Sequence, residues 1–174
     1  FRGFFRDNIS RPLGLTTLDF GARGDALARL ARNYVAGFRI NAPSDMYLKR
    51  AIGTTLEHAV NLSNDPRYYR AVIPAGNGVG TADECSQFFQ CLLNGGRLGG
   101  VRVFKPLTVR RAIAEVGKAE LDRSLMVPLR YSAGMMLGAS PFGMYGPDTS
   151  KAYGHLGFAN NFVWADPERD ISVG

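Results

Sequence analysis

Residues 153–174 constrain the fold more than any other part of the sequence, because they have the pattern of strands joined by a tight turn. Residues 162–164 (Phe-Val-Trp) have strong strand preference, and residues 171–173 continue it after the turn. The turn starts with Asp-Pro at 166–167, which presets one backbone angle and offers a side-chain acceptor to the turn amides. We therefore expect a strand hairpin at this end of the chain.

A histidine lies between two glycines immediately before this hairpin, in residues 154–157 (Gly-His-Leu-Gly). Glycine allows another backbone or a ligand to approach closely. A strand edge with this tetrapeptide can line a site with bare peptide groups and one titratable ring, that of His155.

The composition is that of an ordinary globular protein. The 174 residues are enough for one domain with a core, and 45% of them are hydrophobic and 21% charged. The net charge is +6, but the arginines are scattered and form no basic run, which favours a basic surface over a nucleic-acid interface. No apolar run approaches the roughly 20 residues that span a bilayer, so we predict no transmembrane segment.

The cysteines and histidines predict neither a metal site nor a cofactor. Cys85 and Cys91 lie on different faces of a predicted helix and match no metal-ligand or redox spacing, so we expect packed free thiols. His58 and His155 have no cluster of further ligands around them. The sequence leaves the compartment open between the cytoplasm and export.

Helical periodicity and end signals place the remaining elements. Thr81 is the predicted N-cap of a helix, with Glu84 completing a reciprocal capping box and Gly95 in the glycine cap at its other end. Other predicted helices cover residues 1–10, 25–36 and 106–117. Between the second and the later helices we expect an irregular excursion with short helices at 36–75. A predicted strand covers 125–137, and a Pro/Gly-rich loop covers 140–153.

Several segments, in matching order, resemble the serine β-lactamase-like family, which includes class C β-lactamases, D-alanyl-D-alanine peptidases and family VIII esterases. Residues 155–157 (His-Leu-Gly) are similar to its His-x-Gly triplet, residues 9–15 to its Ile-x-x-Pro-Leu-Gly-Met segment, and residues 73–96 to a signature that ends in Leu-Leu-Asn-Gly-Gly. The resemblance implies an α+β fold of the serine β-lactamase/transpeptidase type, in which helices flank an antiparallel sheet. It also implies that residues 1–174 are one domain, the C-terminal portion of a larger one, so the sheet is incomplete here.

This chain contains no visible nucleophile. No serine is followed three residues later by lysine, no tyrosine is followed two residues later by asparagine, and no Gly-x-Ser-x-Gly elbow is present. In the family, both Ser-x-x-Lys and Tyr-x-Asn precede the Pro-Leu-Gly segment. The resemblance therefore implies that both motifs lie upstream of Phe1, and we expect this fragment alone to be inactive.

The resemblance assigns catalytic roles to the triplet and the residue after it. His155 lines the cleft, although a purely structural histidine is the alternative. Gly157 belongs to the triplet, and the backbone N–H of Phe158 is one half of the oxyanion hole. Leu156 replaces the usual Thr or Ser, so no hydroxyl is available for a β-lactam carboxylate. Predicted substrate contacts are Leu156, Tyr145 and Asn77, with Tyr145 also interpretable as a loop anchor.

We therefore expect a serine hydrolase that acts on a small ester or amide, with esterase- or lipase-like activity favoured. A β-lactamase or a D-alanyl-D-alanine peptidase is the alternative within the enzymes. A non-catalytic protein that keeps the fold for binding is the alternative outside them. Self-association through the missing sheet segments is also possible, because an incomplete sheet exposes unpaired edges.

Overall fold

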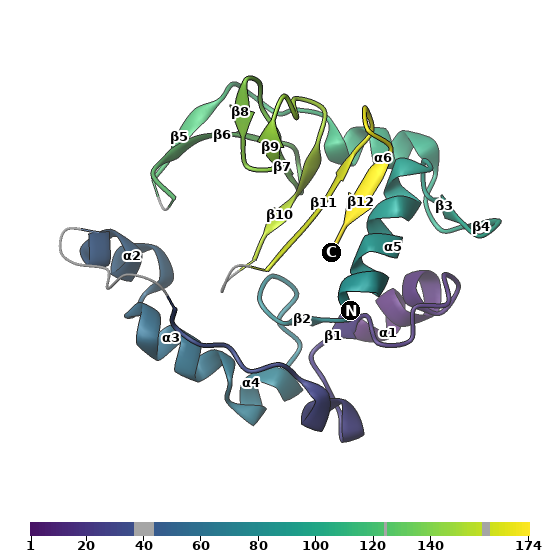
Figure 1. The fold of residues 1–174 in the computed structure, drawn as a ribbon. Coiled ribbons are helices and arrows are strands. Elements are labelled where there is room, and N and C mark those ends of the chain that lie inside the picture. Colours follow the sequence, from purple (N-terminus) through teal and green to yellow (C-terminus); the bar gives the residue numbers. More distant parts are fainter. Residues whose placement is uncertain (37–43, 124, 158–160) are drawn as a thin grey trace. The chain divides into compact units, whose positions relative to one another are not determined.

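The computed structural model describes residues 1–36, 44–123, 125–157 and 161–174 (Figure 1). These residues form two compact units, which are described separately. The first unit comprises Phe1–Asp19, Gly80–Leu121 and Pro128–Gly174, and the second comprises Phe20–Val79 and Asp122–Val127.

The first unit holds most of a six-stranded sheet with the strand order β12-β11-β10-β7-β6-β5. The predicted strands at the end of the chain are confirmed as β10, β11 and β12, which pair antiparallel with Tyr153 opposite Ala165 and Trp164 opposite Val173. The strands of this sheet are β5 (Glu120–Asp122), β6 (Val127–Tyr131), β7 (Met136–Leu137), β10 (Tyr153–Leu156), β11 (Phe162–Asp166) and β12 (Ile171–Val173).

The single strand predicted at 125–137 is wrong, because this segment forms the β6–β7 hairpin. The N–H of Met135 donates to the Ser132 hydroxyl at 2.9 Å, and this local side-chain bond turns the chain. Two smaller hairpins join β3 (Arg97–Leu98) to β4 (Val101–Arg102) and β8 (Phe142–Gly143) to β9 (Gly146–Pro147).

The helices of the first unit are α1 (Arg2–Phe5), continued by a π-helical segment (Arg6–Ser10), α5 (Ala82–Leu93) and α6 (Pro106–Ile113). Helices α5 and α6 build the core against the sheet, whereas α1 has no buried residue. Helix α5 lies beside β11 and β12 (Figure 1). The buried cluster between helices and sheet consists of Phe89, Leu92, Val109, Leu137, Tyr153 and Ala165. Cys91 is fully buried and Cys85 half-buried, and both are free thiols, as predicted.

The start of α5 is confirmed, but its capping box is not reciprocal. The Thr81 hydroxyl accepts the Glu84 N–H at 3.1 Å. The Glu84 carboxylate does not return that bond, because donors of Thr16, Thr17 and Leu18 converge on it at 2.5–3.1 Å. This buried carboxylate therefore fastens residues 16–18 to the first turn of α5.

Helix α6 is shorter than the predicted helix at 106–117. It ends at Ile113, and Val116, expected on its apolar face, is 64% exposed. The N–H of Val116 donates to the Tyr131 carbonyl at 2.8 Å, and Glu115 forms a bridge with Ser132. Hydrogen bonds to the sheet thus replace those that would continue the helix.

The second unit confirms the predicted excursion with short helices. Its helices are α2 (Ser44–Ile52), α3 (Leu56–Ser63) and α4 (Pro66–Arg70), and it holds the strand β2 (Gly78–Val79), while β1 (Asp19–Phe20) lies at the boundary between the units. The Thr55 hydroxyl caps α3 and the Asp65 carboxylate caps α4. Helices α3 and α4 therefore each begin at a side-chain cap.

The helix predicted at 25–36 is wrong, because only Gly24–Arg29 is helical, as a 3₁₀-helix. Leu30 has extended backbone angles, and residues 30–36 form no helix. The Asn33 N–H donates to Asn64 Oδ1 at 2.9 Å, and the Asn64 Nδ2 donates to the Asn33 carbonyl at 2.8 Å. These bonds to the end of α3 occupy backbone groups that a longer helix would need.

Candidate active site

Strand β10, which carries the His-x-Gly triplet, is fixed from both sides. The ring of Tyr153 is 2% exposed and stacks on Phe89 of α5, with centroids 6.3 Å apart. The next residue, Gly154, leaves no room for a side chain, because a Cβ there would lie 2.2 Å from the Val163 carbonyl oxygen and 2.5 Å from Trp164 Cβ. The sequence therefore places β10 tightly against β11.

The edge of β10 toward β7 opens at the triplet. Strand β7 pairs with β10 through Tyr153 and Gly154, and within the described residues the pairing ends there. The Leu156 N–H contacts only the Met136 thioether sulfur, at 3.4 Å, which is a weak acceptor. The Leu156 N–H therefore has only a weak partner at this edge, and a site lined by peptide groups of the triplet stays a prediction.

His155 is exposed, and its Nδ1 lies 2.7 Å from the Leu156 carbonyl oxygen. A carbonyl oxygen only accepts, so this contact requires the proton on Nδ1. In the neutral ring, Nε2 then carries the lone pair and is available to accept a proton or a hydrogen bond. A catalytic role for this ring stays a prediction.

An apolar pocket of about 280 Å³ lies beside the triplet and is lined in part by Leu156. Leu156 and Phe162 face each other across β10 and β11, and Trp164 lies opposite Gly154, so all three side chains share one face of the sheet. Met144 and Tyr145, in the turn between β8 and β9, complete the lining. The lining side chains offer hydrocarbon and aromatic surface to a ligand.

Tyr145 is a wall of this pocket and also an anchor. Its ring stacks on Trp164 with centroids 5.3 Å apart, and its hydroxyl donates to the Met136 carbonyl at 3.1 Å. Burial raises the pKa of Tyr145 well above its usual value, so the phenol stays neutral. The hydroxyl therefore fastens the loop to β7, and its ring faces the pocket.

Two arginines hold the loop that carries Met144 and Tyr145. Arg130 forms a two-point ion pair with Glu115 and also donates to the carbonyls of Gly138 and Ser150. Arg169 bonds the fully buried Asp166 and the Asp148 carbonyl. The Asp166 carboxylate also accepts the Glu168 N–H at 2.9 Å, which confirms the predicted role of the aspartate in its turn.

Gly157 closes the triplet. Its N–H donates to the Asn161 carbonyl, and a Cβ at Gly157 would lie 3.1 Å from that oxygen. Phe158, the predicted oxyanion donor, lies outside the described residues.

Asn77 belongs to the second unit and is 3% exposed. Its Oδ1 accepts the Ile73 N–H, and its Nδ2 donates to the carbonyls of Tyr68 and Ala71, each at 2.9 Å. These bonds hold the loop after α4. A contact between Asn77 and substrate stays a prediction.

Sequence reasoning did not assign Phe162 and Trp164 to the site. They were recognised only for strand preference. The available signal was that Phe162 and Trp164 alternate along β11 and so share one face of it. Using this signal required the register that pairs Phe162 with Leu156 of β10.

Within the described ranges, no group of three or more His, Cys, Asp or Glu side chains is arranged to hold a metal ion. No helix in those ranges is long and apolar enough to cross a membrane.

Comparison with known proteins decides the family. The model of the Beta-lactamase family matches residues 1–174. The chain belongs to this family. Esterase/beta-lactamase LipL of Mycobacterium tuberculosis is 31% identical to it over 147 residues, which is 84% of this chain and 30% of LipL. The predicted family resemblance is thereby confirmed.

Solved structures of this fold cover almost the whole chain. A penicillin-binding protein homologue from Caulobacter crescentus aligns with a TM-score of 0.75 and 27% identity, over 98% of this chain and 44% of that one. A family VIII carboxylesterase aligns with a TM-score of 0.78 and 24% identity, over 99% and 44%. The α+β fold of the β-lactamase type is thereby confirmed. This chain spans under half of each of these proteins, and the residue roles and self-association stay predictions.

Proposed function

We propose that the intact protein is a serine hydrolase that cleaves acyl esters through a covalent acyl-enzyme, in the manner of an esterase or lipase. In this proposal, residues 1–174 are the C-terminal portion of one larger β-lactamase-like domain. The Ser-x-x-Lys and Tyr-x-Asn segments then lie upstream of Phe1, and the isolated chain is inactive. The 31% identity to a protein named an esterase/beta-lactamase supports this activity class.

The apolar pocket beside the triplet is the observation that favours an ester substrate. Leu156, Phe162 and Trp164 give this pocket an apolar lining, and Leu156 supplies no hydroxyl for a carboxylate. An acyl chain in such a pocket gains about 0.8 kcal/mol for each buried methylene group. An ester with a short or medium acyl chain therefore matches the pocket better than a β-lactam that depends on carboxylate recognition.

The proposal gives each triplet residue a role. The Nε2 of His155 accepts a hydrogen bond from the upstream tyrosine or from substrate, because its Nδ1 is engaged by the Leu156 carbonyl. The glycine at 157 lets the chain turn close to Asn161. The backbone N–H of Phe158 binds the developing oxyanion together with the N–H of the nucleophile.

The second candidate is a β-lactamase or D-alanyl-D-alanine peptidase. The similarity to the penicillin-binding protein homologue at 27% identity favours it. A non-catalytic member of the family is the third reading, and upstream loss of the serine and lysine would produce it.

Chromogenic substrates separate these candidates in the intact protein. We expect p-nitrophenyl hexanoate to be hydrolysed with a kcat/KM at least about tenfold above that for p-nitrophenyl acetate, since extra methylenes fill the pocket. A chromogenic cephalosporin should be a poor substrate. Faster hydrolysis of the cephalosporin would support the second candidate, and no hydrolysis of any of the three would support a non-catalytic protein.

A further inference from the structure

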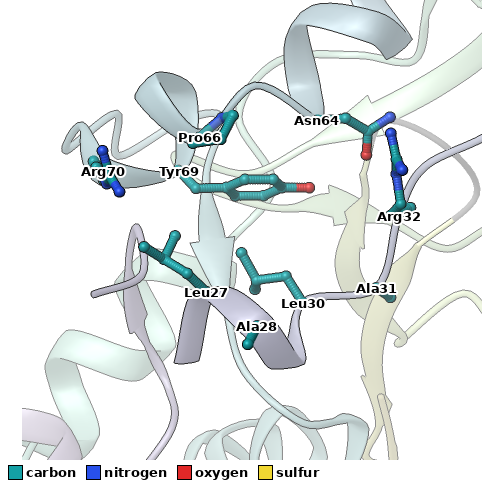
Figure 2. Close-up of a pocket in the computed structure, with 9 residues that line it drawn as sticks. All are labelled: Leu27, Ala28, Leu30, Ala31, Arg32, Asn64, Pro66, Tyr69 and Arg70. Atoms are coloured by element: carbon teal, nitrogen blue, oxygen red, sulfur yellow. The ribbon is translucent and has the colours of Figure 1, made fainter. Parts of the chain in front are cut away.

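A second pocket lies wholly within the second unit and has no part in the proposed hydrolysis. It is formed where residues 27–32 face the end of α3 and α4, and its volume is about 370 Å³ (Figure 2). This volume is within the roughly 300–1,000 Å³ of small-molecule sites, at the lower end.

The walls of this pocket are held in place by hydrogen bonds. Beside the two bonds between Asn33 and Asn64, Asn33 Nδ2 donates to the Ser63 hydroxyl at 2.9 Å. On the other wall, the Tyr69 carbonyl accepts the Ala22 N–H at 2.7 Å. The pocket is therefore largely formed before any ligand arrives.

The middle of this second pocket is apolar. The ring of Tyr69 lies across the pocket, with Leu27 and Leu30 on one side and Pro66 on the other (Figure 2). The ring of Tyr68 meets that of Tyr69 edge-on, with centroids 5.9 Å apart, which fixes its orientation. An apolar chain placed along Leu27 and Leu30 would contact hydrocarbon and an aromatic ring.

The charge at the pocket is positive. Arg32 and Arg70 both line it, and no Asp or Glu does. In the part of the chain that the structure describes, neither arginine forms an ion pair. The Tyr69 hydroxyl points toward the end of the pocket where Arg32 and Asn64 lie (Figure 2). Burial raises the pKa of Tyr69, so this hydroxyl keeps its proton and can donate.

We propose that this pocket binds an amphiphilic carboxylate, a small molecule with one carboxylate group and a short apolar chain. The carboxylate accepts hydrogen bonds from the Arg32 guanidinium and the Tyr69 hydroxyl, and the chain lies on Leu27 and Leu30. A guanidinium pairs with a carboxylate through charge-assisted hydrogen bonds, and the phenol adds a donor in the same region. A bare inorganic anion would leave the apolar floor unused.

Isothermal titration of the intact protein tests this site. The probes are octanoate and, as its uncharged counterpart, octan-1-ol. We expect octanoate to bind in this pocket of the wild type, with octanol at least about tenfold weaker, since charge-assisted hydrogen bonds are roughly twice as strong as neutral ones. Absent octanoate binding, or equal binding of octanol, would overturn the proposal.

Variants assign the binding to this pocket. Arg32→Met keeps an unbranched, flexible side chain but removes the charged guanidinium, and should weaken octanoate binding about tenfold or more. Tyr69→Phe should weaken it several-fold without weakening octanol. Arg29→Met, an exposed arginine outside the lining, is the matched control and should bind as the wild type does. Octanoate affinity unchanged in Arg32→Met, or lowered equally in Arg29→Met, would refute the site.

Discussion

The indole of Trp164 lies nearly parallel to the ring of Tyr145, with the centroids 5.3 Å apart and the planes inclined by 14°. This stack joins strand β11 to the loop at 140–153 and forms one wall of the pocket beside the His-x-Gly triplet. We expect a double-mutant cycle with Trp164→Leu and Tyr145→Leu to give a coupling energy of about 0.5–1.5 kcal/mol in urea unfolding. A control cycle that pairs Trp164→Leu with Phe142→Leu, at a residue that is 83% exposed, should give no coupling. Equal coupling in both cycles would contradict a specific stack.

Leu156 sets the preference for an acyl chain in the proposed hydrolase. Leu156→Thr removes apolar lining and adds a hydroxyl, so kcat/KM for p-nitrophenyl hexanoate should fall roughly tenfold while the value for acetate changes little. Leu121→Thr, at an exposed leucine of strand β5, is the control and should leave the ratio of the two substrates unchanged. A constant ratio in Leu156→Thr would show that acyl chains bind elsewhere.

Gly154 is required by packing between β10 and β11. Gly154→Ala places a methyl group 2.2 Å from the Val163 carbonyl oxygen, so the free energy of unfolding should fall by about 2–3 kcal/mol. Gly3→Ala is the matched control, since a Cβ at Gly3 of α1 meets nothing within 4 Å and alanine favours a helix. Thermal unfolding of both variants measures the difference. An unchanged midpoint for Gly154→Ala would mean that the strands are not this close.

Glu84 makes the stability depend on acid. Burial raises the pKa of its carboxyl, but hydrogen bonds from Thr17 and Thr16 outweigh this, and the net pKa is lowered. Because the pKa is lowered in the folded state, the carboxylate stabilises the fold at pH values above its unfolded-state pKa of about 4.3. That stabilisation is lost as the pH falls through the lower pKa of the folded state.

Glu84→Gln should therefore cost about 2–3 kcal/mol at pH 7, because an amide cannot accept from all the donors of residues 16–18. The deficit should shrink below about pH 4, where the wild type also loses its charge. Urea unfolding between pH 3 and 7 measures it, with Glu120→Gln, at an exposed residue of β5, as the control. A deficit that does not change with pH would exclude a role for the charge.

Local signals in the sequence predicted much of the fold around the candidate site. The Asp-Pro turn and the strand-forming residues around it specified β10, β11 and β12, and Thr81 specified the start of α5. Both features depend on residues close together in the chain. The family resemblance then placed the triplet on a strand.

Contacts between distant residues account for what could not be predicted. The Glu84 carboxylate bonds to residues 16–18 rather than to its own helix end, and the two bonds between Asn33 and Asn64 end a helix that periodicity favours. The pocket likewise depends on the register that sets Leu156 opposite Phe162 and on the loop that brings Tyr145 onto Trp164. Periodicity within one segment does not contain this information.

Labelling of the intact protein with a fluorophosphonate, followed by intact mass and peptide mapping, tests the proposed serine hydrolase most directly. We predict one modified serine, followed three residues later by lysine, in a peptide upstream of residues 1–174. We also predict that p-nitrophenyl hexanoate protects that serine. No label, or a label on a serine within residues 1–174, would contradict the proposed serine hydrolase.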